Sequence, residues 1–277
     1  MMESFNSAGA VLRYTMAGAG LPVVFLHPTP LDHDYWRPLV AELSGVRAIV
    51  PDLRGHGASE MGPELPTGGF ARVPDAPVLT MSQLAADVLE LLDAAGIREA
   101  VFVGCSIGGY VMLELWRRER ARIRGMAFIC SKPQPDAEAG LQKRADNIAR
   151  VRAEGVDGFL DTMAQTLVGA TTRRQQPSIV GEVRARMVLP AESVVAVQAG
   201  LATRPDSAPT VRTIDVPVLA IAGGEDGAVS PEEMRAFREA RGRCDYHVIP
   251  DAGHFAAYEQ PQTVAGLAGP WLELFSS

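Results

Sequence analysis

The chain has 277 residues, of which 47% are hydrophobic and 21% are charged. This composition argues against extended disorder, because enough apolar side chain is available to form a large core. The formal net charge of -7 excludes a general attraction to nucleic acid or to anionic lipid, since both need clustered lysine and arginine.

The N-terminus and the cysteines predict a soluble, cytoplasmic protein. The first residues carry no basic segment followed by an apolar run, and no apolar stretch reaches the roughly 18 residues that a membrane-spanning helix needs. The three cysteines, Cys105, Cys130 and Cys244, are odd in number and widely spaced. Such a set fits buried thiols in a reducing compartment better than it fits disulfides.

Strand-like and helix-like segments alternate along the chain, which is the pattern of a parallel sheet with helices on both faces. Short apolar runs predict buried strands at residues 23–27, 47–51, 101–103, 125–130, 216–222 and 246–250. Between the second and third of these strands, Thr80 and Gln83 form a capping-box pattern, and a helical pattern then runs to Gly96. A last helix is expected over residues 264–275, with a break or kink at Pro270.

One long stretch interrupts this alternation. Residues 133–213 contain several helical patterns but no strong strand, and a structureless loop of that length is rare in a compact domain. We therefore predict one α/β core, formed by residues 1–132 and 214–277, into which residues 133–213 are inserted as a helical lid. A Pro- and Gly-rich segment, residues 61–77, predicts a surface loop.

The pentapeptide Gly104-Cys105-Ser106-Ile107-Gly108 carries the most functional information in the chain. It lies between an apolar strand and a helical pattern, the setting in which a G-x-S-x-G motif displays a nucleophilic serine. The two glycines lack the Cβ atoms that would collide across such a tight turn. Because this turn points position 105 away from the site, Ser106 and not the Cys105 thiol is the predicted nucleophile.

A serine hydroxyl is a poor nucleophile at neutral pH and needs a histidine base that an acid orients. His254 follows the last predicted strand, and Asp226 lies in the loop after the strand before it. Glu225 and Asp251 are competing candidates for the acid. The order serine, acid, histidine along the chain is one of those known for such sites.

With these motifs the chain resembles the α/β-hydrolase superfamily over nearly its whole length. Residues 27–30, His-Pro-Thr-Pro, look like the family's His-Gly-x-Pro oxyanion segment, and residues 52–59 look like its D-x-R-G-x-G-x-S turn. In the family's pattern a proline such as Pro231 follows the acid after a few residues, which favours Asp226 over Glu225. The resemblance implies an α/β-hydrolase fold, a mostly parallel sheet with helices on both faces and a helical lid.

Residues 30–36 and 108–111 look most like a narrower group, the 3-oxoadipate enol-lactonases, small esterases and cofactor-free haloperoxidases. The resemblance implies a serine hydrolase that cleaves a small to medium carboxylic ester or lactone through an acyl-enzyme on Ser106. Asp226 and His254 complete the implied catalytic triad. No cofactor or metal ion is expected.

By the family's pattern, the backbone N–H groups of Thr29 and Ile107 form the oxyanion hole. Pro28 departs from this pattern, because it replaces the usual glycine, has no N–H and fixes its own φ. The loop is therefore expected to follow a different backbone path, with the donor at Thr29 retained. Trp36, shortly after this loop, is a candidate substrate contact, and packing is the alternative role for it.

The same triad fits two other reactions. Release of the acyl group to peroxide would make the protein a cofactor-free perhydrolase or haloperoxidase, and cleavage of a diketone would make it a C–C bond hydrolase. An alternative of another class is a ligand-binding α/β-hydrolase fold without catalysis, against which the intact Ser106, Asp226 and His254 argue. The expected partner is a small-molecule ester or lactone, without nucleic acid or membrane, and assembly into a homo-oligomer stays open.

Overall fold

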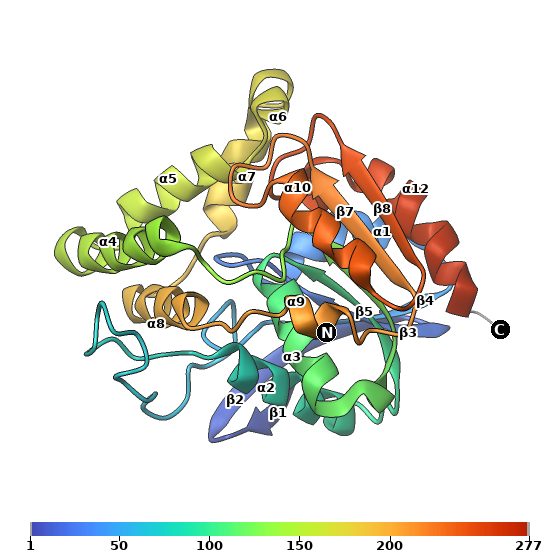
Figure 1. Ribbon diagram of the computed structural model, residues 1–277, viewed down its shortest axis with the longest axis horizontal. Coiled ribbons are helices and arrows are strands. Elements are labelled where there is room, and N and C mark those ends of the chain that lie inside the picture. The colour runs from blue at the N-terminus through green and yellow to red at the C-terminus, as the bar shows by residue number, and fades with distance from the viewer. Residues whose placement is uncertain (1, 276–277) are drawn as a thin grey trace.

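The computed structural model describes residues 2–275, and an eight-stranded sheet forms the centre of that part of the chain (Figure 1). The strands lie in the order β1-β2-β4-β3-β5-β6-β7-β8 across the sheet. Strands β3 to β8 pair in parallel, whereas β1 and β2 form an antiparallel hairpin that joins β4 at one edge. The strand bounds are Met2–Ser7 (β1), Ala10–Gly18 (β2), Leu21–Leu26 (β3), Val46–Pro51 (β4), Ala100–Cys105 (β5), Ile123–Ile129 (β6), Val218–Gly223 (β7) and Cys244–Ile249 (β8).

The predicted mostly parallel sheet is confirmed, and each predicted apolar run lies within or overlaps one of the strands β3 to β8. The central strands β5 and β7 are buried along their whole length, since helices cover both of their faces. The hairpin of β1 and β2 is absent from the sequence prediction. Neither strand contains a continuous apolar run: β1 is mostly exposed, and buried and half-buried residues alternate through much of β2.

Two groups of helices cover the two faces of the sheet. Helices α2 and α3 pack on the face that includes Phe102, and α1 and α12 pack on the face that includes Phe25. The predicted start of α2 is observed, because the Thr80 hydroxyl accepts a hydrogen bond from the Gln83 N–H at 3.1 Å. The helices of the core are Arg37–Glu42 (α1), Met81–Ala94 (α2), Ile107–Glu119 (α3), Pro231–Met234 (α10), Ala256–Glu259 (α11) and Pro261–Leu272 (α12). Short 3₁₀ turns are His33–Trp36 (η1), Arg120–Arg122 (η2), Arg235–Glu239 (η3) and Glu273–Phe275 (η4).

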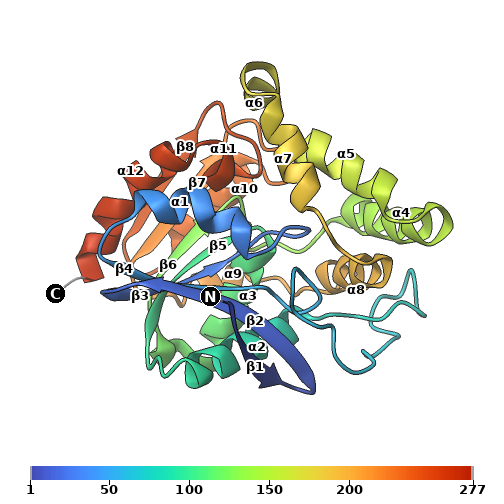
Figure 2. The same cartoon turned by 180° about the vertical axis from the view of Figure 1, so that it is seen from behind.

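Residues between β6 and β7 form further helices, most of which project from one side of the molecule, away from the C-terminus, whereas the last and shortest packs against α3 (Figures 1 and 2). Their bounds are Glu138–Glu154 (α4), Asp157–Leu167 (α5), Ala170–Gln175 (α6), Ser178–Arg186 (α7), Ala191–Ala202 (α8) and Ala208–Val211 (α9). We refer to residues 133–213 as the lid. Over residues 2–275, no helix combines the length and the apolar character needed to cross a membrane.

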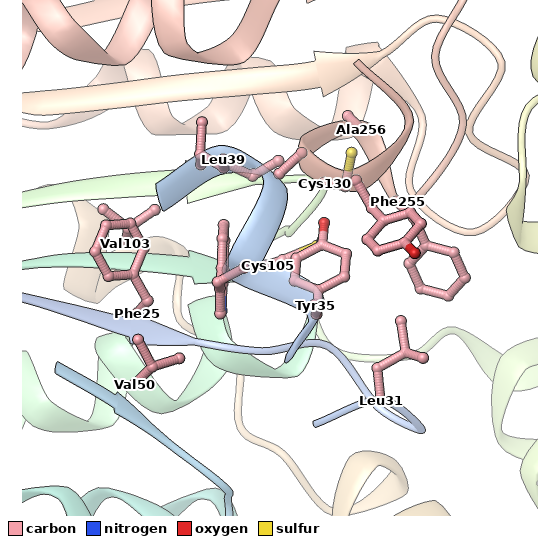
Figure 3. Packing of buried hydrophobic residues seen from close by; sticks show 14 of the residues in the cluster. Phe25, Leu31, Tyr35, Leu39, Val50, Val103, Cys105, Cys130, Phe255 and Ala256 are labelled. Carbon is pink, nitrogen blue, oxygen red and sulfur yellow. The ribbon is translucent and has the colours of Figure 1, made fainter. Parts of the chain in front are cut away.

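Aromatic packing beneath the carboxyl ends of the strands connects the loop after β3 to the loop that carries His254. Tyr35 lies between Cys105 and Phe255 (Figure 3), and its hydroxyl donates to the Cys105 sulfur at 3.3 Å. Phe25 packs against Trp36, with ring centroids 5.4 Å apart. These side chains are fully buried, so they hold the site loops against a rigid core.

Candidate active site

Ser106 occupies a strained turn between β5 and α3. Its φ is +51° and its ψ is -115°, a combination that residues with a side chain rarely adopt. The two flanking glycines make this turn feasible. A Cβ at Gly104 would lie 2.5 Å from the Met112 sulfur, and a Cβ at Gly108 would lie 2.2 Å from the Leu26 carbonyl oxygen. The motif glycines are therefore required by close packing, as the sequence predicts.

Hydrogen bonds to the end of β6 hold this turn in place. The Ser106 N–H donates to the Ile129 carbonyl at 3.1 Å, and the Ser131 hydroxyl donates to the Ser106 carbonyl at 2.9 Å. Gly109 allows the second contact, because a Cβ there would lie 2.3 Å from the Ser131 oxygen. The turn that carries Ser106 is thus held by the end of β6 and the residues just after it, and Ser106 stays 9% exposed at the surface of a cavity.

His254 is hydrogen-bonded to Asp226, with 2.8 Å between Nδ1 and Oδ2. A carboxylate accepts hydrogen bonds, so Nδ1 carries the proton and Nε2 keeps a free lone pair. The second oxygen of Asp226 accepts the N–H groups of Ala228 and Val229, which fixes the carboxylate. Glu225 points elsewhere, because it accepts hydrogen bonds from the Thr171 N–H and hydroxyl. The geometry therefore pairs Asp226, and not Glu225, with the histidine.

A cavity of about 300 Å³ brings the predicted residues together. Ser106, His254 and Thr29 line it, together with residues of the lid and of the loop after Asp226. Ile107 is buried immediately beside Ser106 as the first residue of α3, where an N–H has no partner within the helix. Trp36 does not line this cavity: it is fully buried and packs against Phe25 and Tyr35.

The Thr29 hydroxyl is engaged by His56, 2.9 Å away. Burial lowers the pKa of His56 to about 3, so its ring is neutral at ordinary pH. Its Nδ1 lies 3.0 Å from the Arg54 carbonyl, which can only accept, so Nδ1 carries the proton and Nε2 accepts from Thr29. The Thr29 side-chain proton is thereby directed away from the cavity, and its hydroxyl offers only lone pairs there.

The other residues singled out in the sequence hold the loops around the site. His27 Nε2 accepts the Leu53 N–H at 2.9 Å, which ties the loop after β3 to the turn after β4. Asp52 accepts the N–H groups of His33 and Ala58. Arg54 forms a buried bidentate ion pair with Asp87, 33 residues further along the chain, a partner that the sequence does not indicate.

Burial raises the pKa of the Cys105 thiol far above its ordinary value, so it is held as the neutral thiol.

In residues 2–275 there is no group of three or more His, Cys, Asp and Glu side chains arranged to hold a metal ion. His33 and the nearby aspartates are joined by hydrogen bonds, with 2.7 Å between His33 Nδ1 and Asp52 Oδ1.

Two features of the site are missed by sequence reasoning. Glu259, nine-tenths or more buried, accepts hydrogen bonds from both the histidine loop and the lid. The cavity also carries several lysine and arginine side chains from the lid. Neither has a local motif, although the rarity of lysine in this chain is a signal that could have drawn attention to the second.

The comparisons with known proteins agree with this arrangement. A family model described as the alpha/beta hydrolase fold matches residues 22–261, so the chain belongs to the α/β-hydrolase family. It is 27% identical over 242 residues to 3-oxoadipate enol-lactonase 1 of Acinetobacter baylyi, covering 87% of this chain and 84% of that protein. The predicted family is confirmed.

Solved structures give the same result. A thermophilic esterase from Thermogutta terrifontis superposes with a TM-score of 0.86 and 31% identity, covering 99% of this chain and 97% of the esterase. The enol-lactonase from Burkholderia xenovorans superposes with a TM-score of 0.86 and 25% identity, covering 98% of this chain and all of the enol-lactonase (100%). The protein is thus a hydrolase of the α/β-hydrolase family, with enol-lactonase and esterase relatives.

Proposed function

We propose that the protein cleaves a small to medium carboxylic ester or lactone through an acyl-enzyme on Ser106. The observation that carries this proposal is the hydrogen bond of 2.8 Å between His254 and Asp226 in loops beside the cavity that Ser106 lines. The esterase and enol-lactonase names of the relatives support the same reaction class.

In the first half of the reaction, the Ser106 oxygen attacks the carbonyl carbon of the substrate while His254 Nε2 takes the hydroxyl proton. The imidazolium that forms keeps its Nδ1–H on Asp226, whose negative charge stabilises it. Collapse of the tetrahedral intermediate breaks the bond to the leaving oxygen, and His254 returns the proton to that oxygen. An ester releases an alcohol at this stage, whereas the alcohol of an opened lactone stays attached to the acyl group.

The developing oxyanion accepts the backbone N–H groups of Ile107 and Thr29, each worth about 3 kcal/mol of transition-state stabilisation. Side-chain donation by Thr29 is not part of this proposal, because the Thr29 hydroxyl proton is engaged by His56. In the second half, water loses a proton to His254 and attacks the acyl carbon. The same donors then stabilise the second intermediate, and the acid product leaves with Ser106 regenerated.

Labelling with a fluorophosphonate tests the nucleophile directly. We expect mass spectrometry of the treated protein to show one adduct, on the peptide that contains Ser106, and hydrolysis of short-chain esters to stop with labelling. The Ser106→Ala variant should fold, take no label and lose ester hydrolysis. A folded wild-type protein that stays unlabelled at Ser106 while hydrolysing esters would refute the proposed nucleophile.

A further inference from the structure

One side of the catalytic cavity is strongly basic. Only two of the 26 lysines and arginines of the chain are lysines, Lys132 and Lys143, and both line this cavity. Arg144 and Arg150, which follow Lys143 on α4, also line it. The single carboxylate among the lining residues is Asp136. An acidic protein therefore concentrates positive charge beside its candidate nucleophile.

Most of these cations form ion pairs with carboxylates, but the carboxylates are fewer than the cations. Lys132 pairs with Glu233 at 2.6 Å, and Arg150 pairs with Glu154 at 3.3 Å. Asp136 is shared between two guanidinium groups, those of Arg144 at 3.0 Å and of Arg204 at 2.8 Å, the latter buried behind the cavity wall.

Asp136 stays ionised in this arrangement. Burial acts to raise its pKa, but the hydrogen bonds and charges of Arg204 and Arg144 outweigh burial and lower that pKa below its ordinary value. One negative charge therefore faces two positive ones. Lys143, which is exposed at the cavity, forms no ion pair with any side chain in residues 2–275. The lysines and arginines of the cavity, counted with Arg204, are five, and their carboxylate partners are three. About two positive charges therefore stay in excess.

Part of the cavity wall is apolar. Phe159, Met163 and Leu167 line it from one face of α5, and Val229 lines it from the loop after Asp226. A ligand that fills the cavity thus meets both hydrocarbon and excess positive charge. This combination favours an amphipathic molecule over a wholly apolar one, because an apolar ligand would desolvate the cations without replacing their water.

We propose that the substrate carries a carboxylate, which binds to Lys143 and Arg144 on α4 while its ester or lactone carbonyl lies at Ser106. This proposal rests on the proposed function, since it names the substrate class for the same site. Lys143 is the main determinant, because it brings a charge that no protein carboxylate offsets. Arg144 adds a planar guanidinium that is already held in place by Asp136 and by the Gln198 amide oxygen.

A binding experiment on the Ser106→Ala variant separates this inference from catalysis. The probes are monoethyl adipate and its primary-amide analogue, which match in size and differ in the charge of one end. By calorimetry at low salt, we expect monoethyl adipate to bind about 2- to 5-fold more tightly than the amide, the range of a partly exposed ion pair. The preference should shrink as salt is raised, because the cations are partly exposed.

Three further variants locate the anion site on the Ser106→Ala background. Lys143→Gln should remove most of the preference, whereas Lys143→Arg should retain it. Arg241→Gln is the matched control: it makes the same charge change at an exposed residue just before β8, at the amino ends of the parallel strands, whereas the cavity lies at their carboxyl ends. It should leave the preference unchanged.

Chemical labelling gives a second measurement. Monoethyl adipate, but not the amide, should protect Lys143 from acetylation by an amine-reactive ester, as read by peptide mass spectrometry. Equal binding of the two probes, or a preference that Lys143→Gln leaves intact, would overturn the carboxylate site. Such a result would leave the hydrolase proposal standing, since that proposal depends separately on fluorophosphonate labelling of Ser106.

Discussion

Two adjacent carboxylates, Glu225 and Asp226, follow β7, and the direction of each side chain decides its role. Asp226 faces His254, whereas Glu225 faces the lid and accepts from Thr171. Both carboxylates accept well-defined hydrogen bonds, so residue type and exposed fraction alone would not distinguish their roles. The distinction is one of chemistry: only the carboxylate on Nδ1 can fix the histidine tautomer that leaves Nε2 free to take a proton.

Asp226→Asn should therefore lower kcat by about 10³- to 10⁴-fold with little loss of folding. The Asn oxygen can keep the Ala228 and Val229 N–H groups, which leaves its amide N–H facing Nδ1. This donor forces the proton onto Nε2, the wrong tautomer for a general base. Steady-state ester hydrolysis measures the change. Glu225→Gln, the neighbouring isosteric control, should change kcat by less than about 3-fold, and equal losses in both variants would contradict the assignment.

At the level of elements, a single buried carboxylate joins the lid to the loop that carries His254. One oxygen of Glu259 accepts the N–H groups of Gly169 and Gly253 and the Thr172 hydroxyl, and the other accepts the Phe255 N–H. The His254 N–H also donates to the Leu167 carbonyl of the lid, at 2.8 Å. Buried hydrogen bonds therefore join the end of α5 and the residues after it to the histidine loop.

Glu259→Gln should loosen this connection. A glutamine replaces one accepting oxygen with a donor, so at least one buried N–H or hydroxyl loses its partner, at a cost of about 1–3 kcal/mol. We expect the free energy of unfolding to fall by this amount and backbone amides of residues 167–172 to exchange hydrogen faster. Urea unfolding and hydrogen exchange measure the two effects.

An exposed lid residue provides the control for that variant. Glu192→Gln makes the same change at an exposed position in the first turn of α8 and should leave both measurements unchanged. Faster exchange that spreads evenly over the whole chain would indicate general destabilisation and would contradict a role specific to the lid.

For the molecule as a whole, two buried neutral histidines set how stability depends on pH. Burial lowers the pKa of His27 to about 4 and that of His56 to about 3, from 6.5 in each case. Below pH 6.5 these two histidines bind protons in the unfolded chain but not in the folded protein. The stability from keeping both rings neutral is therefore complete above about pH 6.5 and is lost as the pH falls toward 4.

We expect the free energy of unfolding to fall by up to about 3 kcal/mol per pH unit between pH 6 and pH 5, since two groups titrate. His33 does not offset this loss. Its hydrogen bond to Asp52 raises its pKa, so its contribution is already complete below pH 6.5 and declines only at higher pH. Urea unfolding at pH 7, 6 and 5 measures the slope, and stability that is equal at pH 7 and pH 5 would contradict it.

His56→Gln is the informative variant for this slope. Glutamine can still donate to the Arg54 carbonyl and accept from the Thr29 hydroxyl, but it does not titrate. The variant should therefore show about half the wild-type slope over the same pH range. An unchanged slope would mean that other groups cause the acid destabilisation.

The sequence by itself determined the features that depend on local backbone geometry. The parallel strands, the α2 cap and the glycines around Ser106 follow from short-range patterns, because a continuous apolar run or a strained turn restricts the residues within a few positions of it. The apolar runs also placed Ser106, Asp226 and His254 in loops that follow strands, as observed after β5, β7 and β8. The hairpin of β1 and β2 escaped prediction because its strands lack continuous apolar runs.

Only the tertiary structure decided the features that depend on side-chain direction and distant partners. It separated Asp226 from Glu225, buried Trp36 away from the cavity and directed the Thr29 proton to His56. It also joined Glu259 to the lid and gathered the two lysines at one cavity. The hydrogen bonds among these contacts join residues from 27 to 90 positions apart, where one rotation of a side chain changes its partner, and no local pattern encodes that choice.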